Sequence, residues 1–272
     1  MRRPRLRTVA AGTAITAASL LTAGPASAAG PAYVALGDSY SSGTGTGSYD
    51  PSAGDCQRSG KAYPRLWAAE HKPAKFAFAA CAGATTSTVQ SAQLGALHRN
   101  TRLVSITVGG NDADFAGVMQ VCVIQSAANC ETAVGNAENV MKRTLPGRLD
   151  KLYAGIHRRS PSARVVVLGY PHLYTIVSGC VGIGNAKRTV LNRAADTLDE
   201  TVRRAAARAR FVFADVRPRF AGHELCSGQG WLNAVTIPFG SSYHPTARGH
   251  AEGYLPVFSA AVDRALENAA AR

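Results

Sequence analysis

Residues 33–43 read Tyr33-Val-Ala-Leu-Gly-Asp-Ser-Tyr-Ser-Ser-Gly43, and this stretch decides the fold. Its first four residues form a short apolar run that predicts a buried strand, and Gly37 then opens a polar, glycine-rich turn. Ser39 therefore stands just past the carboxyl end of a strand, which is where open α/β sheets bind ligands. A serine there can act as a nucleophile if a base reaches it. Asp38 and Ser39 would also suit a plain helix cap, so other parts of the chain must decide between the two interpretations.

Apolar runs and helical periods alternate along the rest of the chain. Strands are expected at Tyr33–Leu36, Lys75–Ala80, Leu103–Val108, Arg164–Leu168 and Phe211–Asp215. Helices are expected at Tyr63–His71, Thr86–Leu97, Ala137–Arg159 (kinked at Pro146-Gly147), Lys187–Ala207 and Thr246–Ala270. Such alternation predicts an α/β domain with a parallel sheet of about five strands and helices on both faces. Because right-handed crossovers bring the turns that follow the strands to one edge, the chemistry is expected there.

Two glycine-containing turns at that edge supply candidate hydrogen-bond donors. The segment Cys81-Ala-Gly-Ala-Thr-Thr86 follows the second strand, and Gly83 within it lets a backbone N–H approach a ligand closely. The segment Gly109-Gly-Asn-Asp112 follows the third strand, and Asn111 offers a neutral side-chain donor for a carbonyl oxygen that turns negative. An ordinary glycine turn or a helix cap would explain either segment taken alone.

A histidine near the carboxyl terminus lies in the segment Ser241-Ser-Tyr-His-Pro-Thr-Ala-Arg-Gly249. His244 stands just before an expected helix, with Pro245 in its first turn. His172, in the turn after the fourth strand, competes as a base, but Pro171 directs the chain away and favours a wall or loop role. The other histidines are expected to be structural: His71, His98, His157, His223 and His250.

Together these segments resemble the sequence blocks of the SGNH, or GDSL-type, hydrolases. Gly-Asp-Ser at 37–39 resembles the first block, Gly-Gly-Asn-Asp at 109–112 the third, and His-Pro at 244–245 the last. The resemblance runs over nearly the whole chain after residue 28 and includes the secreted Streptomyces-type lipases, esterases and phospholipases A1. It implies a single-domain, three-layer α/β/α SGNH-hydrolase fold of the flavodoxin-like type.

The resemblance also implies a role for each candidate residue. Ser39 would be the nucleophile of a carboxylic ester hydrolase, and His244 would be its general base. The N–H groups of Ser39 and Gly83 and the side chain of Asn111 would form the oxyanion hole. No metal and no organic cofactor would be needed.

The family pattern places an aspartate three residues before the histidine, but Ser241 occupies that position here. A carboxylate would fix the tautomer of the imidazole and stabilise the imidazolium. A backbone carbonyl can also accept the Nδ1–H and hold the same tautomer. We therefore expect a Ser39–His244 dyad oriented by a main-chain oxygen of Ser241 or Ser242. Asp215 or another distant acid remains the alternative.

The first 28 residues have the features of a secretory signal peptide. Four arginines within the first seven residues precede an apolar stretch from Val9 to Leu21, and Ala26-Ser-Ala28 forms a small-residue cleavage site. The apolar stretch is short for a transmembrane helix, and no later segment is apolar enough to be one. We expect a secreted protein with a signal peptide at 1–28 and one catalytic domain at 29–272.

All six cysteines lie after residue 28, and an even number in an exported chain indicates three disulfides. The sequence alone permits about fifteen connectivities. The similarity to secreted actinomycete lipases and esterases implies consecutive pairing, as Cys56–Cys81, Cys122–Cys130 and Cys180–Cys226. No Cys-x-x-Cys pair is present, so a zinc or redox site is not expected.

The chain is basic, with 30 Lys and Arg against 17 Asp and Glu and a formal net charge of +13. Basic proteins attract nucleic acid, anionic lipid or acidic polymers. No lysine-rich run, RNA-binding signature or zinc-finger spacing is present, so nucleic acid is not an expected partner. No stable protein partner is implied, and a monomer is expected.

The expected substrate is a lipid ester at a membrane or micelle surface, cleaved by phospholipase A1 activity, triacylglycerol lipase activity or both, as the resemblance implies. The segments Tyr174-Thr-Ile-Val177 and Ile237-Pro-Phe239 flank the expected site and are candidates for an acyl groove, although core packing would explain them equally. Two alternatives stay open. One is an esterase of acetylated carbohydrate, and the other is a non-catalytic binding module with a vestigial serine site.

Overall fold

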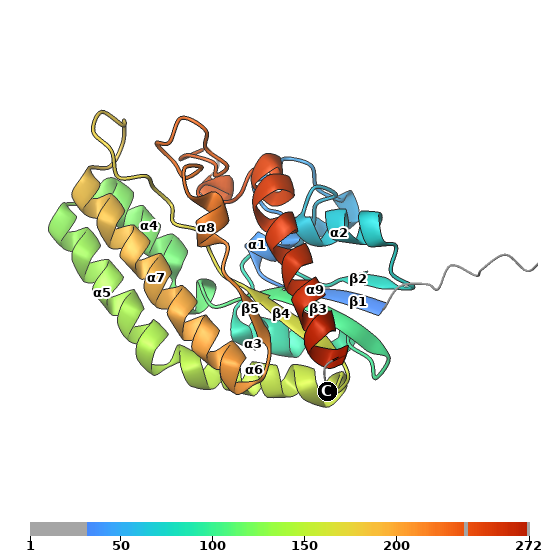
Figure 1. Ribbon diagram of the computed structural model, residues 1–272. Coiled ribbons are helices and arrows are strands. Elements are labelled where there is room, and N and C mark those ends of the chain that lie inside the picture. Colours follow the sequence, from blue (N-terminus) through green and yellow to red (C-terminus); the bar gives the residue numbers. More distant parts are fainter. Residues whose placement is uncertain (1–31, 237–238, 271–272) are drawn as a thin grey trace, which may run out of the picture.

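The computed structural model describes residues 32–236 and 239–270 of the 272-residue chain (Figure 1). The predicted signal peptide at 1–28 lies outside the described residues, as do Ile237 and Pro238 of one predicted groove segment. Within the described part, no helix combines the length and the apolar character that crossing a membrane requires.

Among the described residues, five parallel strands form one sheet in the order β2-β1-β3-β4-β5. Their bounds are Ala32–Gly37 (β1), Phe76–Phe78 (β2), Thr101–Thr107 (β3), Arg164–Leu168 (β4) and Val212–Ala214 (β5). Each expected strand is present, and the predicted α/β class with a parallel sheet is confirmed. The second strand is shorter than expected because the N–H groups of Ala79 and Ala80 both donate to the carbonyl of Ala35, which ends the regular ladder.

Helices cover both faces of this sheet. The bounds are Ser39–Ser42 (α1), Tyr63–His71 (α2), Thr86–Thr88 (α3), Phe115–Ile124 (α4), Ala127–Arg143 (α5), Leu145–Arg159 (α6), Asn185–Arg208 (α7), Arg217–Phe220 (α8) and Leu255–Ala270 (α9). The chain leaves β1 toward β2 and then crosses back through β3, β4 and β5, so right-handed connections place α2 on one face and α3 to α7 on the other. α9 packs beside α2, while α3, α5, α6 and α7 form the opposite layer (Figure 1). The result is the expected three-layer arrangement.

The segment between β3 and β4 differs from the expected single helix at 137–159. It contains α4, α5 and α6, and α5 begins as early as Ala127. The break falls at Thr144, and Pro146 occupies the first turn of α6, where its missing N–H leaves no helical bond unmade. α4 was missed because its sequence, Phe-Ala-Gly-Val-Met-Gln-Val-Cys-Val-Ile, is apolar almost all round and shows no helical period.

Two expected helices contain irregular turns. The one expected at Thr86–Leu97 is α3 followed by a π-helical turn at Val89–Gln93, and α9 becomes regular only after a π-helical turn at Gly249–Tyr254. The first of these turns places the side-chain amide of Gln93 on both backbone groups of Gly37, with two hydrogen bonds of 2.8 Å. The irregular turn thereby fixes the end of β1.

The carboxyl end of β1 lies inside the sheet, where Gly37 pairs with Thr107 of β3. Gly37 has a φ of 120°, and a Cβ at this position would come within 2.4 Å of the carbonyl oxygen of Thr107. A glycine is therefore needed here, because it adopts the positive φ without strain and leaves room for the backbone of Thr107. Residues 33–36 of the same strand are buried, so β1 is a rigid support for the serine that follows it.

Candidate active site

Ser39 is the first residue of α1, the single helical turn that follows β1. Asp38 caps this turn, because its side chain accepts a 3.0 Å hydrogen bond from the backbone N–H of Tyr40. Ser39 is 8% exposed and lines a pocket at the carboxyl edge of the sheet. Asp38 is thus a helix cap, as the sequence allowed, and this cap also places Ser39 at the pocket.

His244 lies directly beside Ser39. Its Nε2 is 2.7 Å from the Oγ of Ser39, and its Nδ1 is 3.0 Å from the carbonyl oxygen of Ser242. Since the carbonyl only accepts, Nδ1 carries the proton and Nε2 is left as the acceptor. Burial lowers the pKa of His244 to about 4, which outweighs the opposing effect of the backbone oxygens of Ser242 and Ser241. The imidazole is therefore neutral at neutral pH.

The backbone before His244 is held in an unusual conformation. Tyr243 has a φ of 65°, in the left-handed region that non-glycine residues rarely adopt. Its carbonyl oxygen accepts a 2.7 Å hydrogen bond from the hydroxyl of Tyr40, and its N–H donates to the carbonyl of Asn233. Asn233 in turn donates its backbone and side-chain N–H groups to the carbonyl of His244. These contacts keep the carbonyl of Ser242 directed at the imidazole.

The carboxylate of Asp38 is surrounded by hydrogen-bond donors. The hydroxyl of Thr107 donates to Oδ1 at 2.6 Å, and the hydroxyl of Tyr170 donates to Oδ2 at 2.5 Å. Burial raises the pKa of Asp38 to about 6, against the opposing effect of these bonds, so the group is ionised at neutral pH. Asp38 thereby links β3 and the end of β4 to the turn that carries Ser39.

Three groups in the turns that follow β1, β2 and β3 are candidate donors for an oxyanion. In the described part of the chain, the backbone N–H groups of Ser39 and Gly83 have no hydrogen-bond partner. Asn111 lines the same pocket as Ser39, and its Nδ2 donates a 3.1 Å hydrogen bond to the carbonyl of Ala84. This bond ties the amide of Asn111 to the turn that contains Gly83 and leaves its second N–H available.

The sequence profile of the GDSL-like lipase/acylhydrolase family matches residues 35–252. The chain belongs to this family. Lipase 1 of Streptomyces coelicolor is 51% identical over 254 residues, which cover 93% of this chain and 94% of that protein. The structure of phospholipase A1 from Streptomyces albidoflavus NA297 is 51% identical with a TM-score of 0.84, over 85% of this chain and 99% of that one. An extracellular lipase from Streptomyces rimosus is 50% identical with a TM-score of 0.83, over the same shares of the two chains.

The resemblance to SGNH hydrolases drawn from the sequence blocks is thereby confirmed. Three of the residues that the sequence predicts for the site lie together in one pocket: Ser39, Asn111 and His244. Gly83 precedes Ala84, whose carbonyl Asn111 contacts, but it is not among the residues that line the pocket.

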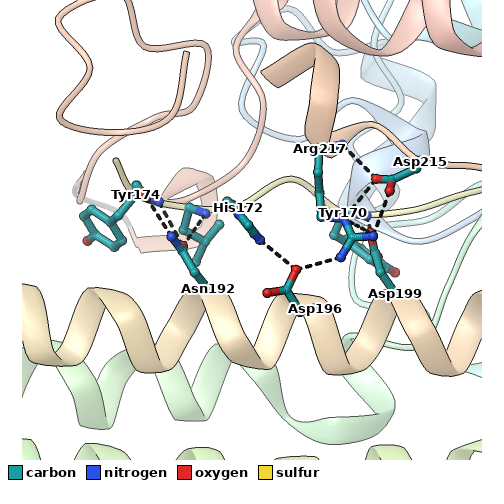
Figure 2. Close-up of polar contacts among 9 residues, drawn as sticks. Tyr170, His172, Tyr174, Asn192, Asp196, Asp199, Asp215 and Arg217 are labelled. Atoms are coloured by element: carbon teal, nitrogen blue, oxygen red, sulfur yellow. Dashed lines mark hydrogen bonds and ion pairs between the residues drawn. The ribbon is translucent and has the colours of Figure 1, made fainter. Parts of the chain in front are cut away.

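Three tyrosines of the site were not singled out in the sequence: Tyr40, Tyr170 and Tyr243. Tyr40 directly follows Ser39 and Tyr243 directly precedes His244, so adjacency was the available signal. Tyr170 lies in the same turn as His172, between β4 and α7. The buried Asp199 of α7 accepts a 2.8 Å hydrogen bond from the N–H of Tyr170 and so supports it from below (Figure 2).

The two residues considered as alternatives at the site have other partners. Nε2 of His172 is 2.7 Å from a carboxylate oxygen of Asp196 on α7, and Asp215 forms an ion pair of 2.7 Å with Arg217. Figure 2 shows both carboxylates joined by the guanidinium of Arg217. Within the described residues no carboxylate contacts the imidazole of His244, whose Nδ1 is bonded to the main-chain oxygen of Ser242.

A pocket of about 600 Å³ opens beside Ser39 and His244. α4, the helix missed in the sequence, forms one wall of it, and Pro171 and Leu173 contribute to another. Of the segments expected to form an acyl groove, Phe239 lines the pocket, whereas residues 174–177, all described, do not. The larger apolar side chains of the α4 wall are Phe115, Met119, Val123 and Ile124.

The structure contains disulfides at Cys56–Cys81, Cys122–Cys130 and Cys180–Cys226. The first joins the loop after α1 to the turn before Gly83, and the third joins the connection that follows β4 to the segment after α8. Among the side chains that the structure describes, no three of His, Cys, Asp or Glu are grouped as metal ligands.

Proposed function

We propose that this protein is a secreted serine hydrolase of lipid esters at a membrane or micelle surface, with phospholipase A1 activity, triacylglycerol lipase activity or both. The supporting observation is the 2.7 Å contact between Oγ of Ser39 and Nε2 of His244, beside a pocket with apolar walls. A nucleophile paired with a base that is itself oriented by a third group is the usual arrangement for acyl transfer. Relatives at 50–51% identity are a phospholipase A1 and two lipases.

In the proposed mechanism, Oγ of Ser39 attacks the ester carbonyl carbon while its proton passes to Nε2 of His244. The tetrahedral intermediate collapses, His244 gives the proton to the leaving alcohol, and the acyl group remains on Ser39. Water then attacks the acyl-enzyme and loses a proton to His244. Collapse releases the fatty acid, and the proton returns to Oγ of Ser39.

Two parts of the site would assist these steps. The carbonyl of Ser242 accepts the Nδ1–H, which keeps Nε2 free to accept the serine proton and orients the imidazolium that forms. The negative oxygen of each tetrahedral intermediate would be stabilised by the N–H groups of Ser39 and Gly83 and by the side chain of Asn111. Burial keeps His244 in its neutral form at neutral pH, and this is the form that can accept the serine proton.

The pocket and the charge support a lipid as the substrate. The α4 wall offers mostly apolar contacts, which suit an acyl chain better than a sugar ring. Residues 29–272 contain 26 Lys and Arg against 17 Asp and Glu, and this net charge of +9 favours approach to an anionic lipid surface. Secretion is supported by the leader-like residues 1–28, by the three disulfides, and by the extracellular lipase of Streptomyces rimosus among the relatives.

In the test, the purified chain and a Ser39→Ala control are each incubated with a mixture of three esters. These are a long-chain triacylglycerol, a diacyl phospholipid with different acyl groups at its two positions, and an acetylated sugar. Mass spectrometry identifies the acid released. We expect Ser39-dependent release of the acyl group at the first position of the phospholipid, with triacylglycerol turnover measuring the lipase activity.

The other outcomes separate the alternatives. Release of acetate alone would keep Ser39 as nucleophile and overturn the lipid substrate. Release of nothing by the wild type, together with no labelling of Ser39 by an organophosphate, would favour a binding module instead.

A further inference from the structure

Large apolar side chains are exposed in only one region of the part that the structure describes. They lie in three segments: the end of α4, the connection between β4 and α7, and the segment that precedes His244. Val181 is 94% exposed, Ile124 is 67% exposed and Phe239 is 60% exposed. We call this set the apolar rim, and its members are Ile124, Ile176, Val177, Val181, Val235 and Phe239.

Contacts between the three segments bring the apolar rim together. The disulfide Cys180–Cys226 joins the connection after β4 to the segment after α8, from which the chain runs on to Val235. The ammonium group of Lys187, at the start of α7, contacts the carbonyl oxygens of Cys122 and Gln125 at the end of α4. In Figure 1 the two connections project from the same side of the molecule, next to the end of α4.

The connection after β4 is fixed at its base and along its length. Asn192 of α7 bonds the N–H and carbonyl of Tyr174, and His172 pairs with Asp196 (Figure 2). Further along, the buried guanidinium of Arg188 donates to the carbonyl of Val177 at 3.3 Å and to that of Cys180 at 2.7 Å. These bonds restrain the backbone beside Ile176 and Val181, whose side chains are exposed to solvent.

The apolar rim is continuous with the pocket, because Ile124 and Phe239 belong to both. The mouth of the pocket therefore opens among exposed apolar side chains. We propose that the apolar rim is a docking surface for aggregated lipid, which places the pocket mouth against the lipid layer. This inference rests on the proposed hydrolysis of lipid esters.

The composition of the apolar rim favours a lipid surface over a protein partner. Protein interfaces concentrate binding energy in Trp, Tyr and Arg, whereas the rim consists of aliphatic side chains and one phenylalanine. A protein seated there would cover the pocket mouth, while a lipid layer would supply the pocket with acyl chains. The positive charge of the chain adds attraction to an anionic lipid layer.

The test measures binding to vesicles of phosphatidylcholine and phosphatidylglycerol in equal parts by the Ser39→Ala chain, which removes hydrolysis. Val181→Asp is added because this residue belongs to the rim but not to the pocket. In the docked state the side chain at position 181 would lie in the lipid layer. Replacing the valine by aspartate removes that apolar burial and requires desolvation of a carboxylate, which should raise the dissociation constant about tenfold or more. Val181→Leu should bind like its parent. Ala207→Asp, an exposed position at the far end of α7, adds the same charge on the opposite edge and should also leave binding unchanged.

Equal binding by Val181→Asp and its parent, or equal weakening by Val181→Asp and Ala207→Asp, would overturn the docking surface. Hydrolysis of a short-chain, water-soluble ester by Val181→Asp with Ser39 restored should match wild type, which shows that the variant is folded. Binding is measured on a chain without the nucleophile, so it does not depend on turnover. Absence of any lipid hydrolysis by the wild type would instead contradict the proposed function.

Discussion

The hydroxyl of Tyr40 donates a 2.7 Å hydrogen bond to the carbonyl oxygen of Tyr243, which stands 203 positions later in the chain. Tyr40 is the neighbour of Ser39, and Tyr243 is the neighbour of His244. The bond therefore ties the segment that carries the proposed nucleophile to the segment that carries the proposed base. It also satisfies a carbonyl whose residue has a φ of 65°, a conformation that costs about 1 kcal/mol or more.

Tyr40→Phe should lower kcat on a water-soluble ester about tenfold and change KM little. The substitution leaves the carbonyl of Tyr243 without its donor, at a cost of about 1–3 kcal/mol, and loosens the loop that positions His244. Steady-state kinetics checks this split. The matched control is Tyr174→Phe, which removes only the 3.0 Å contact between the two hydroxyls of Tyr174 and Tyr243. Equal losses in both variants would argue against a positioning role for the Tyr40 bond.

Ser241→Ala should retain turnover within about twofold, because the group that contacts Nδ1 of His244 is the main-chain oxygen of Ser242. Neither the hydroxyl of Ser241 nor a carboxylate contacts this imidazole among the described residues. Asp215→Asn should likewise leave kcat close to wild type, since Asp215 pairs with Arg217. The measurement is kcat on the same ester, and a drop of a hundredfold or more (about 2.7 kcal/mol) in either variant would restore a side-chain orienting group.

Asn111→Ala should lower kcat by about a hundred- to a thousandfold with a small change in KM, because an oxyanion donor acts mainly in the transition state. Asn111→Asp should lose at least as much, since it replaces a donor with a negative charge. Gly83 cannot be tested so cleanly, because its φ of 76° strains any other residue. Activity of Asn111→Ala close to wild type would remove Asn111 from the oxyanion hole.

The pH profile of kcat/KM should keep its plateau down to mildly acidic pH and fall near pH 4. Burial lowers the pKa of His244 to about 4, and protonation of the imidazole removes the acceptor for the serine proton. The profile is measured on a neutral, water-soluble ester so that substrate charge does not change. An acid limb near the ordinary histidine pKa of 6.5 that persists in Asp38→Asn would contradict the low pKa of His244, since the pKa of Asp38 is itself raised to about 6.

The same burial predicts how the free energy of unfolding depends on pH. The folded pKa of His244 lies below its ordinary value, so its contribution is fully present above pH 6.5 and is lost as pH falls toward 4. The loss from this residue alone is about 3 kcal/mol. Asp38, whose pKa is raised to about 6, contributes in the opposite direction. Comparison with His244→Gln in urea titrations at pH 7 and pH 4 isolates the histidine, and an identical pH dependence of both chains would contradict the shift.

Most of the sheet and the site was predictable because the signals are local. The short apolar runs of β1, β3 and β4 contain enough β-branched and aromatic residues to be recognised, and the turns after them contain glycine at the points of close approach. α4 shows where such signals fail. Its apolar sequence has no polar face, so only its packing against α5 and the pocket identifies it as a helix.

The sequence by itself determined the five strands in chain order, the family blocks, and the turns that carry Ser39, Asn111 and His244. These depend on side-chain period and on the backbone preferences of glycine and proline, which act over a few residues. Only the tertiary structure decided that the carbonyl of Ser242 contacts Nδ1 of His244, that Tyr40 and Tyr170 support the site, and that α4 lines the pocket. Those contacts join residues as far apart as the 205 positions between Ser39 and His244, and such distances are closed by packing of the whole domain.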